Sequence, residues 1–124
     1  MTITIVKKPS IFRDILLLTI KENFPNLLMK VFDTYSLGRL VKNENISDLI
    51  IIDIDIDVNL SLLIQSYKQL NRKVIVWTNR INENNLIEFF KLNLDGYFYN
   101  RMEKEELAKA IYIVINGENM YIQN

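Results

Sequence analysis

Two kinds of apolar pattern alternate along this chain. Short runs of branched and aromatic side chains, each typical of a β-strand, occur at residues 2–6, 27–32, 48–53, 73–78 and 96–99. Apolar residues recur at helical spacing over residues 11–24, 36–44, 60–70, 84–93 and 103–115. The pattern therefore predicts strands and helices in strict alternation, with a strand first and a helix last.

The ends of two of these helices carry further signals. Ser10 stands where an N-cap is expected for the helix over residues 11–24, and Pro25 follows that helix. The apolar residues that recur close to helical spacing in it are Ile11, Ile15, Leu18 and Phe24. Gly117 suits the C′ position after the last helix, where a left-handed backbone is common.

The run at residues 48–53 is apolar on both faces, as a central parallel strand must be when helices cover both sides of its sheet. Alternating strands and helices specify an α/β domain with a parallel sheet. Five such units in 124 residues match the flavodoxin-like three-layer sandwich, in which a five-stranded parallel sheet has the order 2-1-3-4-5. Since no linker or repeat interrupts the pattern, we expect residues 1–124 to form a single domain.

Composition narrows the function classes. Fifteen basic and fifteen acidic residues give a formal net charge of zero, which argues against direct binding of nucleic acid or of an anionic membrane surface. Cysteine and histidine are both absent, which excludes disulfides, zinc sites with the usual ligands, and histidine or cysteine catalysis. No run reaches the roughly 18 apolar residues of a membrane span, and the N-terminal run is too short for a signal peptide. We therefore expect a cytoplasmic protein.

Three carboxylates end the central apolar run, at Asp53, Asp55 and Asp57. If the strand continued through all three, their side chains would share one face and could form a metal cradle. The alternative is that Asp53 closes the strand and the other two lie in the loop beyond it. In the flavodoxin-like order, ligands bind at the carboxyl ends of the strands beside the point where the strand order reverses. Asp53 and the pair Lys7 and Lys8 are both expected at that edge.

Several strings, in this order and spacing, resemble the receiver domains of bacterial two-component response regulators, of the CheY-like fold, and specifically those that precede a LuxR/NarL-type helix-turn-helix. The strings are IFRD (11–14), SDLIIIDID (47–55), VIVWT (74–78), LDGYFYN (94–100) and EELAKAI (105–111). The resemblance covers about residues 2 to 122.

The resemblance implies a site and a chemistry. In that family, Mg²⁺-dependent transfer moves a phosphoryl group from a histidine kinase to an aspartate at the end of strand 3, which is Asp53 here. A Ser/Thr at the end of strand 4 contacts the phosphoryl group, and Thr78 matches it. An aromatic residue on strand 5 turns inward on activation, and Tyr97 is the matching switch aromatic.

The other functional positions of the family are changed. Lys7 and Lys8 stand where two acidic residues normally hold the metal, and Asn100 replaces the strand 5 lysine. Mg²⁺ favours carboxylate oxygens, whereas an ammonium group carries only donors and repels a cation. We therefore expect a degenerate phosphoacceptor pocket with no metal, cofactor or enzymatic activity. An ion pair between Asp53 and one of the lysines would attract by roughly 4 kcal/mol before desolvation.

These observations favour a phosphorylation-independent pseudo-receiver that serves as a protein interaction and dimerisation module in signal transduction or transcription regulation. One alternative is a conventional receiver that is phosphorylated at Asp53. Another is a Mg²⁺-dependent phosphohydrolase of the DxD type, whose pair would be either Asp55 and Asp57 or Asp53 and Asp55. For that class only Asp95 lies downstream as a further acid.

The expected partner is a second copy of the chain or another response regulator, and a helix-turn-helix DNA-binding domain could follow outside residues 1–124. The helix expected over residues 103–115 carries apolar residues nearly all round its last turns, and the helix expected over residues 84–93 carries two adjacent phenylalanines. The interface candidates are Phe89, Phe90, Ile111, Tyr112 and Ile115.

Overall fold

The computed structural model describes residues 1–33, 46–56, 58–80 and 82–121. Its elements are β1 (Thr2–Val6), α1 (Ile11–Asn23), β2 (Leu28–Phe32), β3 (Leu49–Asp53), α3 (Leu60–Gln69), β4 (Lys73–Thr78), α4 (Glu83–Lys91), β5 (Gly96–Tyr99), α5 (Lys104–Ile115) and β6 (Met120–Tyr121). The helix expected over residues 36–44, and Asp57, lie outside the described residues. None of the described helices has the length and apolar character to cross a membrane.

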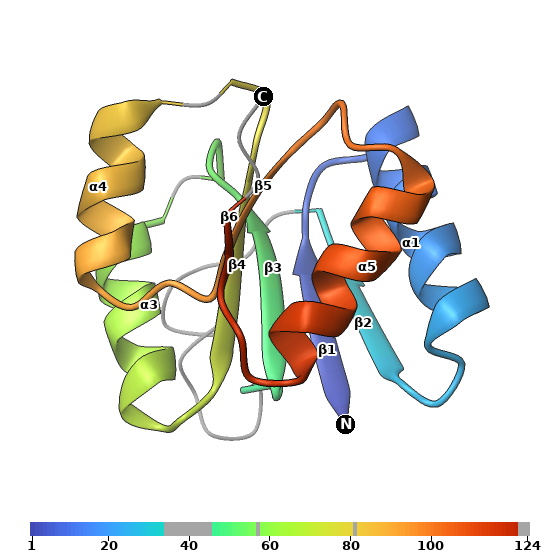
Figure 1. The fold of residues 1–124 in the computed structure, drawn as a ribbon, viewed down its shortest axis with the longest axis horizontal. Coiled ribbons are helices and arrows are strands. Elements are labelled where there is room, and N and C mark those ends of the chain that lie inside the picture. Colours follow the sequence, from blue (N-terminus) through green and yellow to red (C-terminus); the bar gives the residue numbers. More distant parts are fainter. Residues whose placement is uncertain (34–45, 57, 81, 122–124) are drawn as a thin grey trace.

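The strands form one sheet in the order β2-β1-β3-β4-β5-β6, and every neighbouring pair is parallel. The first five strands have the predicted order 2-1-3-4-5, so the flavodoxin-like fold is confirmed. In Figure 1, α1 and α5 lie together on one side of the sheet, and α3 and α4 lie on the other. The sheet is thus the middle layer of three.

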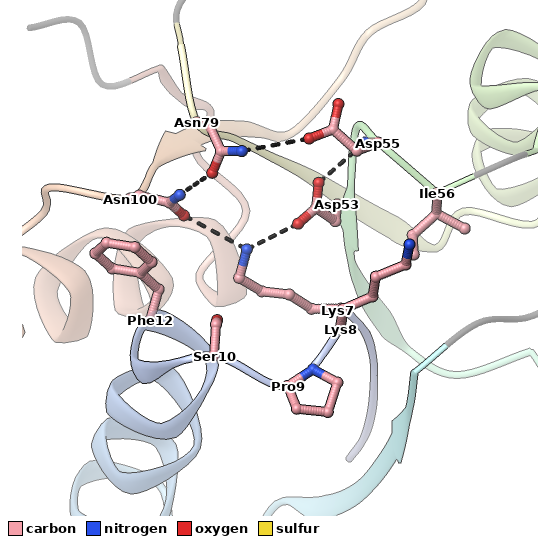
Figure 2. A pocket seen from close by; sticks show the side chains of 10 residues that line it. All are labelled: Lys7, Lys8, Pro9, Ser10, Phe12, Asp53, Asp55, Ile56, Asn79 and Asn100. Carbon is pink, nitrogen blue, oxygen red and sulfur yellow. Dashed lines mark hydrogen bonds and ion pairs between the residues drawn. The ribbon is translucent and has the colours of Figure 1, made fainter.

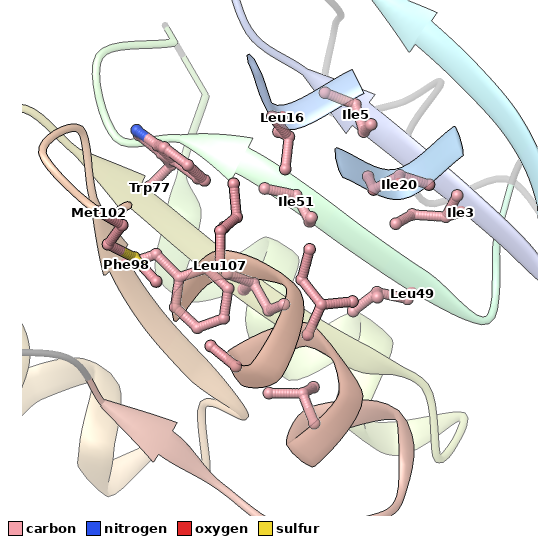
Figure 3. Close-up of a cluster of buried hydrophobic side chains, with 14 residues drawn as sticks. Ile3, Ile5, Leu16, Ile20, Leu49, Ile51, Trp77, Phe98, Met102 and Leu107 are labelled. Atoms are coloured by element: carbon pink, nitrogen blue, oxygen red, sulfur yellow. The ribbon is translucent and has the colours of Figure 1, made fainter. Parts of the chain in front are cut away.

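The apolar run of β3 supplies both cores. Leu49 and Ile51 belong to the cluster between the sheet and α1 with α5, shown in Figure 3. Ile50 and Ile52 belong to the cluster between the sheet and α3 with α4. Because side chains alternate along a strand, a central strand covered on both faces must be apolar at every position. All of β3 is buried.

Helix α1 buries a different face from the one that its apolar spacing suggested. Its buried residues are Leu16, Thr19 and Ile20. Of the apolar residues that predicted the helix, Ile11 and Leu18 are 68% and 49% accessible and Ile15 is also exposed, whereas Phe24 packs against the core. Periodicity identifies a helix without saying which of its apolar residues meet the sheet. Ile11, Ile15 and Leu18 therefore form an exposed apolar surface.

Both helix-end predictions are confirmed. The Ser10 hydroxyl oxygen accepts a hydrogen bond from the Arg13 amide at 3.1 Å, as an N-cap does. Gly117 adopts a positive φ of 91°, and its amide donates to the carbonyl of Val114 at 3.0 Å. A left-handed residue at this point turns the chain back sharply at the end of α5.

The short strand β6 was not predicted. After the turn at Gly117 the chain runs along the edge of β5, where Met120 lies opposite Gly96 and Tyr121 opposite Tyr97. The Met120 amide donates to the carbonyl of Asp95 at 2.8 Å. Two residues are too few for a periodic signal in the sequence. Its consequence is that β5 is not the edge of the sheet.

Candidate functional site

Strand register brings Lys7 and Asp53 together. Val6 lies opposite Ile52 in the parallel pair of β1 and β3, so the next residue of each strand meets at the carboxyl edge of the sheet. Asp53 in turn lies opposite Trp77 of β4. Side chains at matching positions point to the same face. The three side chains therefore converge on the side of the sheet that α1 and α5 cover.

Lys7 is the lysine that pairs with Asp53. Its ammonium nitrogen lies 2.8 Å from Asp53 Oδ2, and the two side chains are only 5% and 12% exposed. The same nitrogen lies 5.4 Å from the centroid of the Trp77 ring, within reach of a cation–π interaction. Lys8 is exposed and turns the other way, toward Ile56 (Figure 2).

Hydrogen bonds extend this pair into a closed ring of five residues, which we call the polar ring: Lys7, Asp53, Asp55, Asn79 and Asn100. Lys7 also donates to Asn100 Oδ1 at 3.4 Å, and the side-chain amide of Asn100 donates to the Asn79 side-chain oxygen. Asn79 donates to Asp55 Oδ2 at 3.4 Å, and the backbone amide of Asp55 donates to Asp53 Oδ1 at 2.9 Å. Figure 2 shows the complete circuit.

A cavity of about 350 Å³ opens beside the polar ring. Its lining residues are Lys7, Lys8, Pro9, Ser10, Phe12, Asp53, Asp55, Ile56, Asn79 and Asn100. Two lysines and two aspartates face it, so the charges in its wall balance. Within the described ranges of the chain, no three acidic side chains gather where they could hold a metal ion.

Asp53 and Asp55 do not share one strand face. β3 ends at Asp53, and Asp55 is exposed in the turn that follows. The backbone amide of Asp55 donates a hydrogen bond to Asp53 Oδ1, which is the local contact that an aspartate side chain makes with the backbone two residues ahead. The interpretation in which only Asp53 belongs to the strand is the one that holds for these two residues.

Thr78 and Tyr97 lie near the ring and outside it. The Thr78 hydroxyl accepts from the Arg80 amide at 3.1 Å and donates to the Arg80 carbonyl at 2.6 Å, so it holds a turn. Tyr97 is fully buried on the α3 and α4 side, and its hydroxyl accepts from the Asn82 amide at 3.4 Å. Both side chains therefore fix the loop between β4 and α4.

Two residues of this site were missed from the sequence. Asn79 joins the ring from the first position after β4, and an asparagine in a loop carries no signal of its own. Trp77 was expected in the core, where it does lie, but its indole nitrogen also donates to Asn100 Oδ1. Trp77 lies opposite Asp53 in the pairing of β3 with β4, which places Trp77 at the site. The sequence alone does not give this register, because it does not show which residues of the two strands pair.

The interface candidates divide into two groups. Phe89 is 4% exposed and Ile111 is fully buried, so neither can contact a partner, and those two assignments are corrected. They fill the core because each lies on the sheet-facing side of its helix. Phe90 and Tyr112 are both 61% exposed. Ile115 is half-buried against the core cluster beneath α1 and α5.

Two further ion pairs lie at the opposite edge of the sheet. Asp95 precedes β5 and is paired with Lys68 at 2.9 Å. Asp48 precedes β3 and accepts from the Thr2 amide at 2.7 Å, with Arg72 at 2.5 Å. The Thr2 hydrogen bond, aided by Arg72, holds the pKa of the Asp48 carboxyl below its ordinary value. These groups cannot take part in chemistry at Asp53.

The solved structures that this chain resembles include receiver domains of response regulators. The non-phosphorylated receiver domain of the stress response regulator RcsB from Escherichia coli superimposes with a TM-score of 0.78 at 17% identity, over 99% of this chain and 98% of that one. The receiver domain of a DNA-binding response regulator from Colwellia psychrerythraea gives 0.75 at 20% identity, over 93% and 98%.

A LuxR-family DNA-binding response regulator from Staphylococcus aureus gives a TM-score of 0.73 at 17% identity, over 91% of this chain and 97% of that one. No protein-family model matches the sequence. No curated protein matches it either. The comparisons therefore establish the receiver fold, at identities too low to carry the function across.

Proposed function

We propose that this chain is a receiver domain that works without phosphorylation, as a protein interaction module in signal transduction or transcription regulation, and that it has no catalytic activity of its own. The ion pair between Lys7 and Asp53 carries the proposal. It places a cation of the protein itself against the carboxylate that would accept a phosphoryl group in a conventional receiver. The receiver fold of the neighbours supports the signalling context.

The residues at this edge do not fit Mg²⁺. The Lys7 ammonium occupies Asp53 Oδ2, and Asp53 Oδ1 accepts the Asp55 amide, so both carboxylate oxygens have donors. A divalent ion would have to displace a nearly buried ammonium and then lie beside its positive charge. Without a metal, the charge that develops on a transferred phosphoryl group lacks its usual stabilisation.

The alternatives find less support. A conventional receiver needs Asp53 as an available nucleophile, and here that carboxylate is held by Lys7. A DxD phosphohydrolase needs a further acid near its aspartate pair. Asp95 cannot supply it, because it lies at the amino edge of the sheet in an ion pair with Lys68.

An exposed apolar surface is available for the interaction. We call it the α1/α5 face: Ile11, Ile15 and Leu18 on α1 with Tyr112 on α5, all exposed. The two helices lie beside each other on the same side of the sheet (Figure 1). A contiguous apolar stripe along one helix exceeds the scattered apolar residues that surfaces normally carry.

The occupant that we propose for this face is a second copy of the chain. Glu22 and Lys104 form an ion pair at 2.5 Å across α1 and α5, so the face carries both signs of charge at its end. A twofold axis brings the same surface of two copies together, so a face that carries both signs of charge can be complementary to itself. A net charge of zero opposes the approach of two copies less than a highly charged chain would.

Intact mass measurement after incubation with acetyl phosphate and Mg²⁺ tests the proposal. The expected result is no phosphoryl adduct on the wild-type chain, while a conventional receiver treated in parallel is labelled. Beryllofluoride with Mg²⁺ should likewise leave the fluorescence of Trp77, the single tryptophan, unchanged. An adduct that disappears in Asp53→Asn would show a working phosphoacceptor and overturn the proposal.

A further inference from the structure

We infer that the polar ring is a permanent lock on the loops that lead into α4 and α5. It rests on the proposed function in one respect, namely that no phosphoryl group enters the pocket. The lock keeps the loop after β4 and the loop after β5 in one arrangement with no ligand, metal or modification present. Asn79 and Asn100 are the residues that connect Lys7 and Asp53 to those loops.

The ring joins segments that are far apart in the sequence. Lys7 follows β1, Asp53 ends β3, Asn79 follows β4 and Asn100 follows β5. Each of these residues lies at, or directly after, the carboxyl end of its strand. A closed circuit of hydrogen bonds restricts all its members together, because displacing one leaves its neighbours unsatisfied.

The hydrogen bonds run in one donor-to-acceptor direction, from the buried Lys7 ammonium through Asn100 to Asn79. Asn100 Oδ1 accepts hydrogen bonds from both the Lys7 ammonium and the Trp77 indole N–H, so the oxygen of this side-chain amide must point inward. Its nitrogen must then point outward, where it donates to the oxygen of Asn79. The nitrogen of Asn79 in turn points to Asp55. The Lys7 ammonium and the Trp77 indole together therefore set the orientation of two amides in succession.

Each loop is tied further at its own base. The Thr78 hydroxyl closes a turn with Arg80 directly after Asn79. Asn82 is the N-cap of α4, where its side chain accepts from the Asn84 amide at 3.0 Å. The backbone amide of Asn100 donates to the carbonyl of Thr78, the last residue of β4, at 3.1 Å, which joins the loop after β5 to the end of β4. The position of Asn79 is thus linked to the starts of both helices.

Hydrogen exchange of the chain, without any phosphoryl donor or partner, tests the lock. Asn79→Ala removes two links of the ring from an exposed side chain that contributes nothing to the core. Exchange in peptides covering the loops after β4 and β5 should rise about two- to tenfold, the change that corresponds to an ordinary hydrogen bond. Asn84→Ala, an exposed asparagine nearby and outside the ring, is the control and should leave that exchange unchanged.

Lys7→Met should loosen both loops and change the Trp77 emission, because it removes the central donor and the charge over the indole ring. Lys8→Met, its exposed neighbour, should do neither. If Lys7→Met does not fold, the hydrogen exchange of Asn79→Ala is the test of the lock. Exchange in both loops that is the same in Asn79→Ala as in wild type overturns the lock. That result would leave the proposed function standing if no phosphoryl adduct forms, so the two failures are distinguishable.

Discussion

The ammonium of Lys7 lies 2.8 Å from the carboxylate of Asp53, at the edge of the sheet where strand register makes the two residues neighbours. Both side chains are nearly buried, so desolvation offsets much of their attraction. Removing one partner is worse than removing both, because the remaining charge is buried without compensation. Because of this asymmetry, the contribution of the ion pair to the free energy of unfolding can be measured by comparing the single and double variants.

Asp53→Ala should lower the free energy of unfolding by about 1–3 kcal/mol, because it leaves Lys7 without its carboxylate. Lys7→Met combined with Asp53→Ala should cost less than the sum of the single changes. Urea denaturation of the four proteins completes the double-mutant cycle. Single-mutant effects that simply add would mean that the pair contributes nothing to stability.

Replacing Lys7 and Lys8 together by Asp should convert the site into one that binds a divalent ion. An added carboxylate at position 7, beside Asp53, and another at position 8, in the wall of the same cavity, repel one another and supply the oxygen ligands that Mg²⁺ prefers. The variant should be less stable than wild type without metal and should regain stability as Mg²⁺ is added. The wild-type denaturation midpoint should not respond. A variant equally indifferent to Mg²⁺ would contradict the assignment of these positions.

Dimerisation through the α1/α5 face predicts that Leu18→Glu gives a folded monomer, since a buried carboxylate opposes association. Leu62→Glu is the matched control, because Leu62 is 46% exposed on α3 and Leu18 is 49% exposed on α1. Sedimentation at micromolar concentration should show a dimer for wild type and for Leu62→Glu. If the wild-type chain sediments as a monomer by itself and as a complex when another receiver is added, the occupant of the α1/α5 face is that receiver and not a second copy.

Asp48 should contribute a pH-dependent part of the stability. Its pKa is lowered in the folded chain by the Thr2 hydrogen bond and by Arg72, so its stabilisation is present above the unfolded value of about 3.9. The stabilisation is lost as the pH falls through the lower folded value. In Asp48→Asn the decline of stability below about pH 4 should therefore be shallower than in wild type. Parallel slopes for the two proteins would exclude this contribution.

Two glycines should respond to alanine for different reasons. A Cβ on Gly96 would lie 2.9 Å from Ile75 Cγ1 and 3.0 Å from Phe98 Cε1, so Gly96→Ala should cost about 1–3 kcal/mol by overpacking. A Cβ on Gly117 meets nothing within 4 Å, but its φ of 91° is unfavourable for alanine. Gly117→Ala should cost about 1–2 kcal/mol. Thermal or urea unfolding measures both, and a neutral Gly96→Ala would show that β5 can shift.

The elements of this fold follow from local pattern. The strands at residues 73–78 and 96–99 and the helix caps at Ser10 and Gly117 were predicted where they lie, because side-chain alternation, β-propensity and capping act between residues close in the chain. The strand order followed from the number and spacing of the units. The identity of Asp53 as the strand end was available in the same way.

Three features depended on contacts between distant segments. Lys7 and Lys8 are adjacent in sequence, and only the register of β1 with β3 places one against Asp53 and turns the other to solvent. The buried face of α1 was decided by how the helix meets the sheet, since apolar residues occur on more than one side of the helix and periodicity does not choose among them. Asn100 joins Lys7 across 93 positions, and no local pattern reports such a contact. Local forces select the elements, and the packing of those elements selects which polar side chains meet.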